Sequence, residues 1–97
     1  DAAAIRIEEN RRMRALFMDA AEVVGDSGLA GKLAAAGKAE GLGYKLSELD
    51  ADNSRLRGLL VELHVAVENQ FGDAARALDS RIWRLLKAFE AARAPRR

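Results

Sequence analysis

Apolar residues recur every three or four positions along most of the chain, which is the spacing of one face of an α-helix. We expect three long helices, over residues 2–24, 47–70 and 74–94, and a weaker helix over residues 29–40. The one proline, Pro95, lies two residues from the end, and β-branched and aromatic residues are sparse. The pattern therefore predicts an all-α fold, a helical hairpin or small helical bundle with coiled-coil character, built as one domain.

The segments between the predicted helices contain glycines and short polar residues. Two glycines within residues 29–40 each cost about 1 kcal/mol relative to alanine, so we expect a short crossover helix or a partly ordered linker there. Ser47 and Asp50 have the spacing of a capping box at the start of the third helix. Asp73 is the expected N-cap of the last helix.

The third segment carries the clearest pattern. Its apolar residues follow a heptad repeat, with a positions at 46, 53, 60 and 67 and d positions at 49, 56, 63 and 70. It resembles leucine-zipper-type coiled coils in general, a resemblance that implies no particular function. Asn53 stands at an a position, where a polar side chain lowers stability but fixes register. Either its amide pairs with a second amide, or it lies part-exposed near the helix start as a secondary cap.

An internal repeat offset by 43 residues relates residues 9–19 to residues 52–62, with four identical positions. The repeat puts Asn10 in the same register as Asn53. If the first helix, the connector and the third helix run up, down and up, the first and third helices are parallel neighbours. We then expect the two amides to meet, within one chain or across a dimer, since a buried unpaired amide costs about 1–3 kcal/mol.

Four side chains outside the heptad seam are candidates for contacts at the bundle surface. Trp83 lies either at the edge of the core or on a partner-facing hot spot, where tryptophan is enriched. Phe71 is expected to clasp the end of the bundle, and Tyr44 packs on the bundle or faces a partner. His64, the only histidine, is expected to be solvated, with Glu68 one helical turn later.

Charge is placed unevenly along a chain of 97 residues whose net charge is only +1 at pH 7. Residues 1–73 carry a net charge of −4 and residues 74–97 a net charge of +5. The candidate basic surface of the last helix consists of Arg81, Arg84, Lys87 and Arg93. It would suit a nucleic acid, an acidic lipid surface or an acidic protein, or the acidic helices of its own bundle. We favour the bundle or a protein partner, because no base-stacking cluster accompanies the charges.

Several classes of chemistry are excluded or disfavoured by the residues present. The chain has no cysteine, so disulfides, zinc–thiolate sites, Fe–S clusters and thiol catalysis are excluded. The segment from Gly31 to Lys38 departs from a phosphate loop, because five residues separate its glycines and no strand precedes it. No apolar run approaches the roughly 18 residues of a membrane span. Abundant alanine and arginine are typical of GC-rich bacterial genomes, and a chain without cysteine is compatible with a reducing cytoplasm, so we expect a cytoplasmic bacterial protein. We expect no enzymatic activity, cofactor or metal, because the sequence contains no nucleophile–base set, metal-ligand set or phosphate loop.

These patterns favour a non-enzymatic protein–protein interaction module, a small accessory, adaptor or assembly subunit. A chain of this size has a small core, which a second copy or a larger protein would complete through the heptad seam. The predicted partner interface consists of Asn10, Met13, Phe17, Asn53, Leu56, Leu60, Leu63, Val67 and Trp83. Two alternatives are a small nucleic-acid-binding regulator that uses the basic last helix and a bundle that encloses a small apolar ligand.

Overall fold

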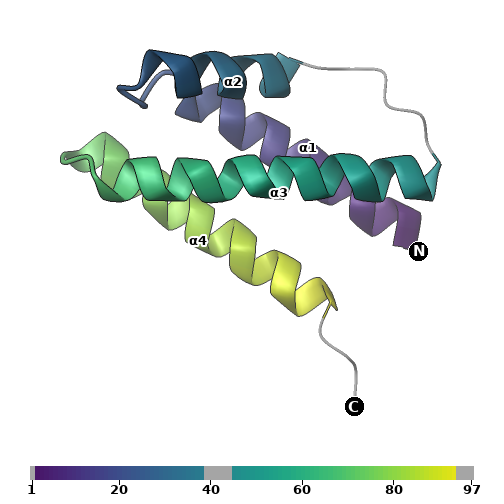
Figure 1. Ribbon diagram of the computed structural model, residues 1–97. Helices are drawn as coiled ribbons and strands as arrows, with labels where there is room; N and C mark the ends of the chain where they lie inside the picture. The colour runs from purple at the N-terminus through teal and green to yellow at the C-terminus, as the bar shows by residue number, and fades with distance from the viewer. Residues whose placement is uncertain (1, 39–44, 94–97) are drawn as a thin grey trace.

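Four α-helices follow one another in the computed structural model, which describes residues 2–38 and 45–93 (Figure 1). They are α1 (Ala2–Ala20), α2 (Ser27–Lys38), α3 (Leu46–Glu68) and α4 (Asp73–Arg93). No strand occurs in these ranges, so the all-α prediction is confirmed. The weaker predicted segment forms a helix of 12 residues, α2. Tyr44 lies outside the described residues.

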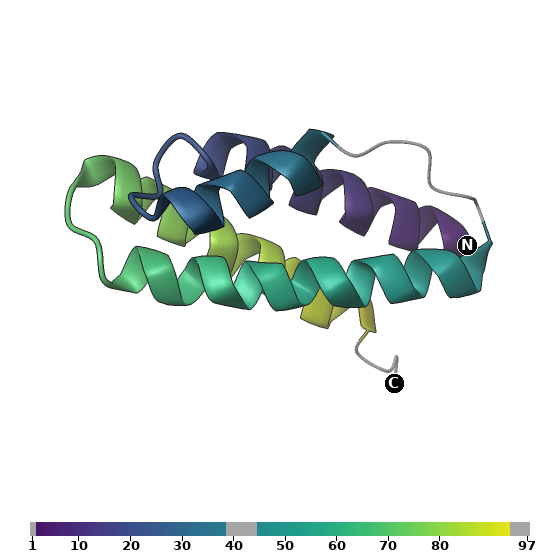
Figure 2. The same cartoon turned by 45° about the horizontal axis from the view of Figure 1, so that its top comes forward.

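The helices alternate in direction, so that α1 and α3 run the same way and α2 and α4 run opposite to them (Figures 1 and 2). Short turns join α1 to α2 and α3 to α4, and each pair therefore forms an antiparallel hairpin. Helices α1 and α3 each contact all the other helices, whereas α2 and α4 do not contact each other within the described ranges. The predicted parallel arrangement of the first and third helices is confirmed.

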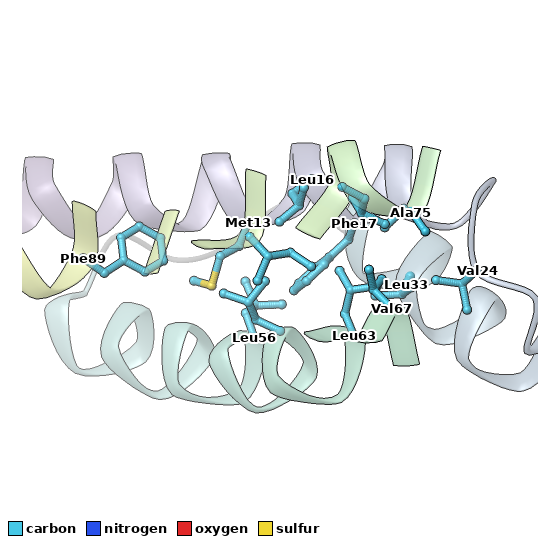
Figure 3. Packing of buried hydrophobic residues seen from close by; sticks show 14 residues of the cluster. Met13, Leu16, Phe17, Val24, Leu33, Leu56, Leu63, Val67, Ala75 and Phe89 are labelled. Carbon is cyan, nitrogen blue, oxygen red and sulfur yellow. The ribbon is translucent and has the colours of Figure 1, made fainter. Parts of the chain in front are cut away.

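The core between α1 and α3 follows the 43-residue repeat. Buried residues at positions 13, 17, 20 and 24 correspond one by one to buried residues at 56, 60, 63 and 67. Figure 3 shows Met13 and Phe17 pointing from α1 toward Leu56 and Leu63 of α3. Complete burial of a large apolar side chain stabilises the fold by about 1.5–3 kcal/mol. The heptad seam is thus the main packing surface of the chain's own core.

The other two helices cover this pair with buried apolar side chains. Helix α2 contributes the fully buried Leu33, and α4 contributes Ala75, Leu78, Ile82 and Phe89. Gly37 allows α2 to approach α1 closely, because a Cβ atom there would lie 2.7 Å from the sulfur of Met18 and 3.1 Å from the carbonyl oxygen of Arg14.

The link between α1 and α2 differs from the prediction at both of its ends. Helix α1 ends at Ala20 instead of residue 24, since the chain tightens into a turn in which Val23 N–H donates to the Ala20 carbonyl (3.0 Å). Helix α2 begins earlier than expected because Asp26 caps it. Asp26 Oδ1 accepts hydrogen bonds from the backbone N–H groups of Gly28 (2.9 Å) and Leu29 (3.2 Å).

Both predicted N-caps of the later helices are wrong. Helix α3 has Lys45 as its N-cap in an extended conformation without a side-chain cap, so Ser47 lies inside the helix and forms no capping box. At α4 the first helical hydrogen bond runs from Arg76 N–H to the carbonyl of Gly72 (3.1 Å), and Asp73 is already helical. Gly72 has φ 121°, a conformation that glycine adopts without strain, and it turns the chain from α3 into α4.

Candidate functional site

A cluster of polar side chains lies buried between α1 and α3, and we call it the polar hub. It consists of Asn10 and Arg14 on α1 and Asp52 and Asn53 on α3, none of them more than 9 % exposed. The two asparagines occupy a positions of the heptad, which directs them onto the seam between the helices. Asp52 directly precedes Asn53, and Arg14 follows Asn10 by one turn, so all four reach the same place.

Asn10 and Asn53 face each other across the seam. Nδ2 of Asn10 donates to Oδ1 of Asn53 (2.8 Å), and Nδ2 of Asn53 donates to the carbonyl oxygen of Arg6, one turn earlier in α1 (2.9 Å). The predicted meeting of the two amides is confirmed, and it occurs within a single chain. The alternative of a part-exposed cap is wrong, because Asn53 is fully buried.

Asp52 is the charged centre of the hub. Its Oδ2 accepts hydrogen bonds from Asn10 Nδ2 (2.7 Å) and Arg14 Nη2 (2.6 Å), and its Oδ1 accepts one from Arg55 Nη2 (2.6 Å). Burial by itself raises the pKa of Asp52, but the hydrogen bonds from Asn10 and Arg55 and the charges of Arg14 and Arg55 outweigh it. The pKa of Asp52 therefore lies below its ordinary value, and the carboxylate is ionised at neutral pH.

Arg14 connects the hub to a third helix. Its Nε donates to Asn10 Oδ1 (2.9 Å), and its Nη1 donates to the carbonyl oxygen of Ala36 in the last turn of α2. Carbonyl groups in the last turn of a helix have no partner within that helix, so the guanidinium satisfies one of them. The hub thus ties α1, α2 and α3 together at one point.

The chemistry of the hub is that of a structural lock. Its donors and acceptors bond to one another and to backbone carbonyls, which fixes the register of the helices. Within the described residues, no group of three or more His, Cys, Asp or Glu side chains is placed to hold a metal ion. The two asparagines were predictable from their heptad position, whereas Arg14 and Asp52 were not predicted, because nothing in the sequence pattern separates them from solvated charges.

Most of the residues predicted to form a partner interface lie instead in the core of the single chain. Those with at most 7 % exposure are Asn10, Met13, Phe17, Asn53, Leu56, Leu60, Leu63 and Val67. Helices α1 and α3 of the same chain therefore fill the seam. Only Trp83 of the predicted set lies on the surface, 49 % exposed.

Exposed apolar side chains gather on the α3–α4 hairpin. Val61 and Val65 of α3 are 56 % and 52 % exposed, and Trp83 of α4 meets His64 edge-on with ring centroids 5.4 Å apart. We call the exposed side of the hairpin that carries these two valines and Trp83 the outer face of the hairpin. Val61 and Val65 also line a groove with Leu29 and Lys32 of α2. Phe71, in the turn, is 99 % exposed. The prediction that it clasps the bundle end is wrong, because it extends from the turn into solvent.

His64 lies at the junction of α3 and α4. Its Nε2 is 3.0 Å from Glu68 Oε1, and its Nδ1 is 3.2 Å from Asp79 Oδ1 of α4. The side chain is less solvated than expected, since α4 packs over the imidazole and leaves only 19 % of it exposed, whereas Glu68 lies beside it as the sequence suggested. The sequence identified Glu68, one turn later in the same helix, as a neighbour of His64. It did not identify Asp79 and Trp83, because they come from another helix, α4.

The basic residues of α4 divide into two groups. Arg81 forms an ion pair with Asp19 of α1 at 2.9 Å, as expected if part of this helix complements its own bundle. Arg84 and Lys87 are exposed, as is Arg76, and none of the three forms an ion pair with another described residue. The side chain of Arg93 lies outside the described residues.

Helices α2 and α3 border an open groove, and its α3 wall includes Val61, Glu62 and Val65. Small and apolar residues such as Ala35 and Gly58 line it, and Lys32 and Glu62 approach each other across it at 3.7 Å. An open groove does not enclose a small apolar ligand, so it gives no support to that alternative.

No protein-family model matches the chain, and neither a curated protein nor a solved structure matches it. None of the four described helices combines the length and the apolar character that crossing a bilayer requires.

Proposed function

We propose that the chain is a non-enzymatic helical interaction module, a small accessory or adaptor subunit that binds a protein through the outer face of its α3–α4 hairpin. The observation that carries this proposal is the exposure of two large aromatic side chains on that hairpin, Trp83 and Phe71. Aromatic residues that leave much of their surface in water are enriched where proteins bind one another. Val61 and Val65 extend the apolar surface along α3.

The polar hub supports this proposal indirectly. A binding surface is most effective when it sits on rigid helices, because little conformational entropy is then lost on association. The hub fixes α1 and α3 in register, and α4 packs on both of them. The outer face therefore lies on helices that the hub and the core packing hold in fixed positions.

Site-specific photo-crosslinking in producing cells tests the proposal. A benzophenone side chain is placed at Phe71 or at Trp83, and a matched control is placed at Arg11, whose side chain is 72 % exposed on α1. We expect crosslinks to protein from the first two positions and none from the control. Equal crosslinking at all three positions, or none at any, would overturn the proposal.

A second candidate function is nucleic-acid binding by α4. The observation that favours it is the exposure of Arg76, Arg84 and Lys87 without ion pairs to other described residues. Three phosphate contacts would give binding to duplex DNA a slope of about −3 in log affinity against log salt concentration. Retention on DNA or RNA with that salt dependence, lost on replacing Arg84 and Lys87 by glutamine, would favour this function over protein binding.

A further inference from the structure

The outward sides of α3 and α4 carry two stripes of exposed residues with the same spacing. The stripe of α3 is Ser54, Gly58, Val61, Val65 and Glu68, and the stripe of α4 is Arg76, Ser80, Trp83, Lys87 and Glu90. Both advance in alternating steps of four and three residues, the spacing with which one helix packs along another. Each stripe is thus suited to receive a helix, although no helix of this chain covers it within the described residues.

Charge divides the same surface into two halves. From Gly58 to the turn, α3 contains no lysine or arginine. It exposes Glu62, which Lys32 of α2 approaches at 3.7 Å, and Glu68, which lies 3.0 Å from His64. Helix α4 exposes Arg76 and Arg84, which form no ion pair with other described residues. An acidic stretch of α3 therefore lies beside a helix whose exposed charges are mainly basic, although Glu90 ends its stripe, and Val61, Val65 and Trp83 lie at the centre.

We propose that the occupant of the outer face is a second copy of this chain, related to the first by a twofold axis parallel to the α3–α4 hairpin. The inference rests on the proposed function and names its partner. Such an axis lays α4 of each copy over α3 of the other, so a basic helix meets an acidic helix twice. A surface with both signs of charge arranged in this way is complementary to itself.

The symmetry also fixes which residues meet. A twofold axis parallel to the hairpin leaves the height of each residue along it unchanged, so the partner's Trp83 lies at the height of Trp83 itself. The contact of 5.4 Å between ring centroids places the His64 ring within 5.4 Å of this height. The exposed α3 residues that flank His64 are Val61 and Val65, and the partner's Trp83 is seated on them.

The same reasoning places the charges, because a helix rises 1.5 Å per residue. Arg84 directly follows Trp83, so it comes to the height of Glu62 in the other copy. Arg76 lies seven residues, about 10.5 Å, nearer the connecting turn than Trp83, and Glu68 lies four residues, about 6 Å, nearer it than His64. The two are therefore within one helical turn of the same height. Each copy would therefore contribute two ion pairs at the edge of an apolar centre, the arrangement typical of protein interfaces.

A dimer of ordinary extent would cover a small part of the surface of this chain. A standard interface covers about 800 Å² on each partner. That is roughly an eighth of the 6336 Å² that the chain exposes.

Charge-swapped variants of the full chain test the proposal. One variant carries Arg76→Glu with Arg84→Glu, and the other carries Glu62→Lys with Glu68→Lys. Within a homodimer of either variant like charges would meet, whereas a mixed dimer would restore both opposite-charge contacts. Sedimentation velocity over a concentration series should show dimers for the native chain, monomers for each variant and dimers for the equimolar mixture. Circular dichroism confirms that each variant keeps its helices.

Trp83, the one tryptophan of the chain, supplies a second measurement. Its emission should shift to shorter wavelength as the native chain dimerises, and Trp83→Ala should weaken dimerisation about tenfold or more. Native chain that stays monomeric at every concentration, variants that still dimerise alone, or a mixture that stays monomeric would each overturn the proposal. If one of these outcomes overturns the homodimer, crosslinks from Phe71 and Trp83 to a different protein would still support the proposed function. The partner would then be that protein and not a second copy of this chain.

Discussion

Asn10 and Asn53 lie 43 residues apart, at equivalent places in an internal repeat, and share a hydrogen bond of 2.8 Å. In coiled-coil dimers a pair of asparagines at a positions joins two chains and fixes their register. Here one chain supplies both members, because α2 returns it so that α3 runs alongside α1 in the same direction. The repeat thus lets a short chain form a parallel helix pair by itself.

The first prediction concerns the amide pair. Replacing Asn10 by alanine removes the hydrogen-bonding partner of Asn53, Asp52 and Arg14 inside the core. We expect the free energy of unfolding, measured by urea denaturation, to fall by about 1–3 kcal/mol. Asn69→Ala is the matched control, because the Asn69 side chain is exposed and donates to one backbone carbonyl. Losses of equal size in the two variants would contradict a special role for the buried pair.

The second prediction concerns Asp52 and pH. Since its pKa is lower in the folded chain than the ordinary value of 3.8, the ionised carboxylate stabilises the fold above about pH 4. That stabilisation is lost as pH falls through the pKa of the folded state. We expect Asp52→Asn to lower the free energy of unfolding at pH 7 by about 3–5 kcal/mol, because Arg14 loses its buried partner.

Urea denaturation of the native chain and Asp52→Asn from pH 7 to pH 3 measures this effect. The difference in stability between the two proteins should narrow as the pH falls, because the native carboxylate then becomes protonated. A difference that stays constant over this range would show that the charge of Asp52 does not stabilise the fold.

The third prediction compares two glycines within α2. A Cβ atom at Gly31 would meet nothing within 4 Å, so Gly31→Ala should raise the free energy of unfolding by about 0.5–1 kcal/mol through helix propensity. A Cβ atom at Gly37 would press on the Met18 side chain and the Arg14 carbonyl. We therefore expect Gly37→Ala to lower stability and the midpoint of thermal unfolding. Equal stabilisation by both substitutions would mean that α2 does not approach α1 as closely as described.

The fourth prediction separates the core from the outer face by two neighbouring residues of α3. Leu60 is fully buried, and Leu60→Asp should abolish the cooperative thermal transition observed by circular dichroism. Val61 is 56 % exposed, and Val61→Asp should keep the helices while it prevents self-association in sedimentation velocity. A Leu60→Asp variant that still folds would contradict the orientation of α3, in which Leu60 points into the core.

Much of this architecture was predictable from the amino-acid sequence. The 3.6-residue period of apolar positions marks the helices, since one face of each must be buried. The offset of 43 residues aligned Asn10 with Asn53 before any packing was known. The ends of the helices were less predictable, because caps such as Asp26 and Lys45 depend on the path of the chain into the helix.

The sequence by itself determined which residues form helices and which face of α3 is apolar, because both follow from local periodicity. Only the tertiary structure decided what covers that face: α1 of the same chain fills the seam around Leu56 and Leu60. The tertiary structure also buries the ion pair between Arg14 and Asp52 and places His64 between α3 and α4. It leaves the Phe71 side chain exposed. A period states that a face is apolar but not which helix meets it, since that choice depends on contacts between residues far apart in the chain.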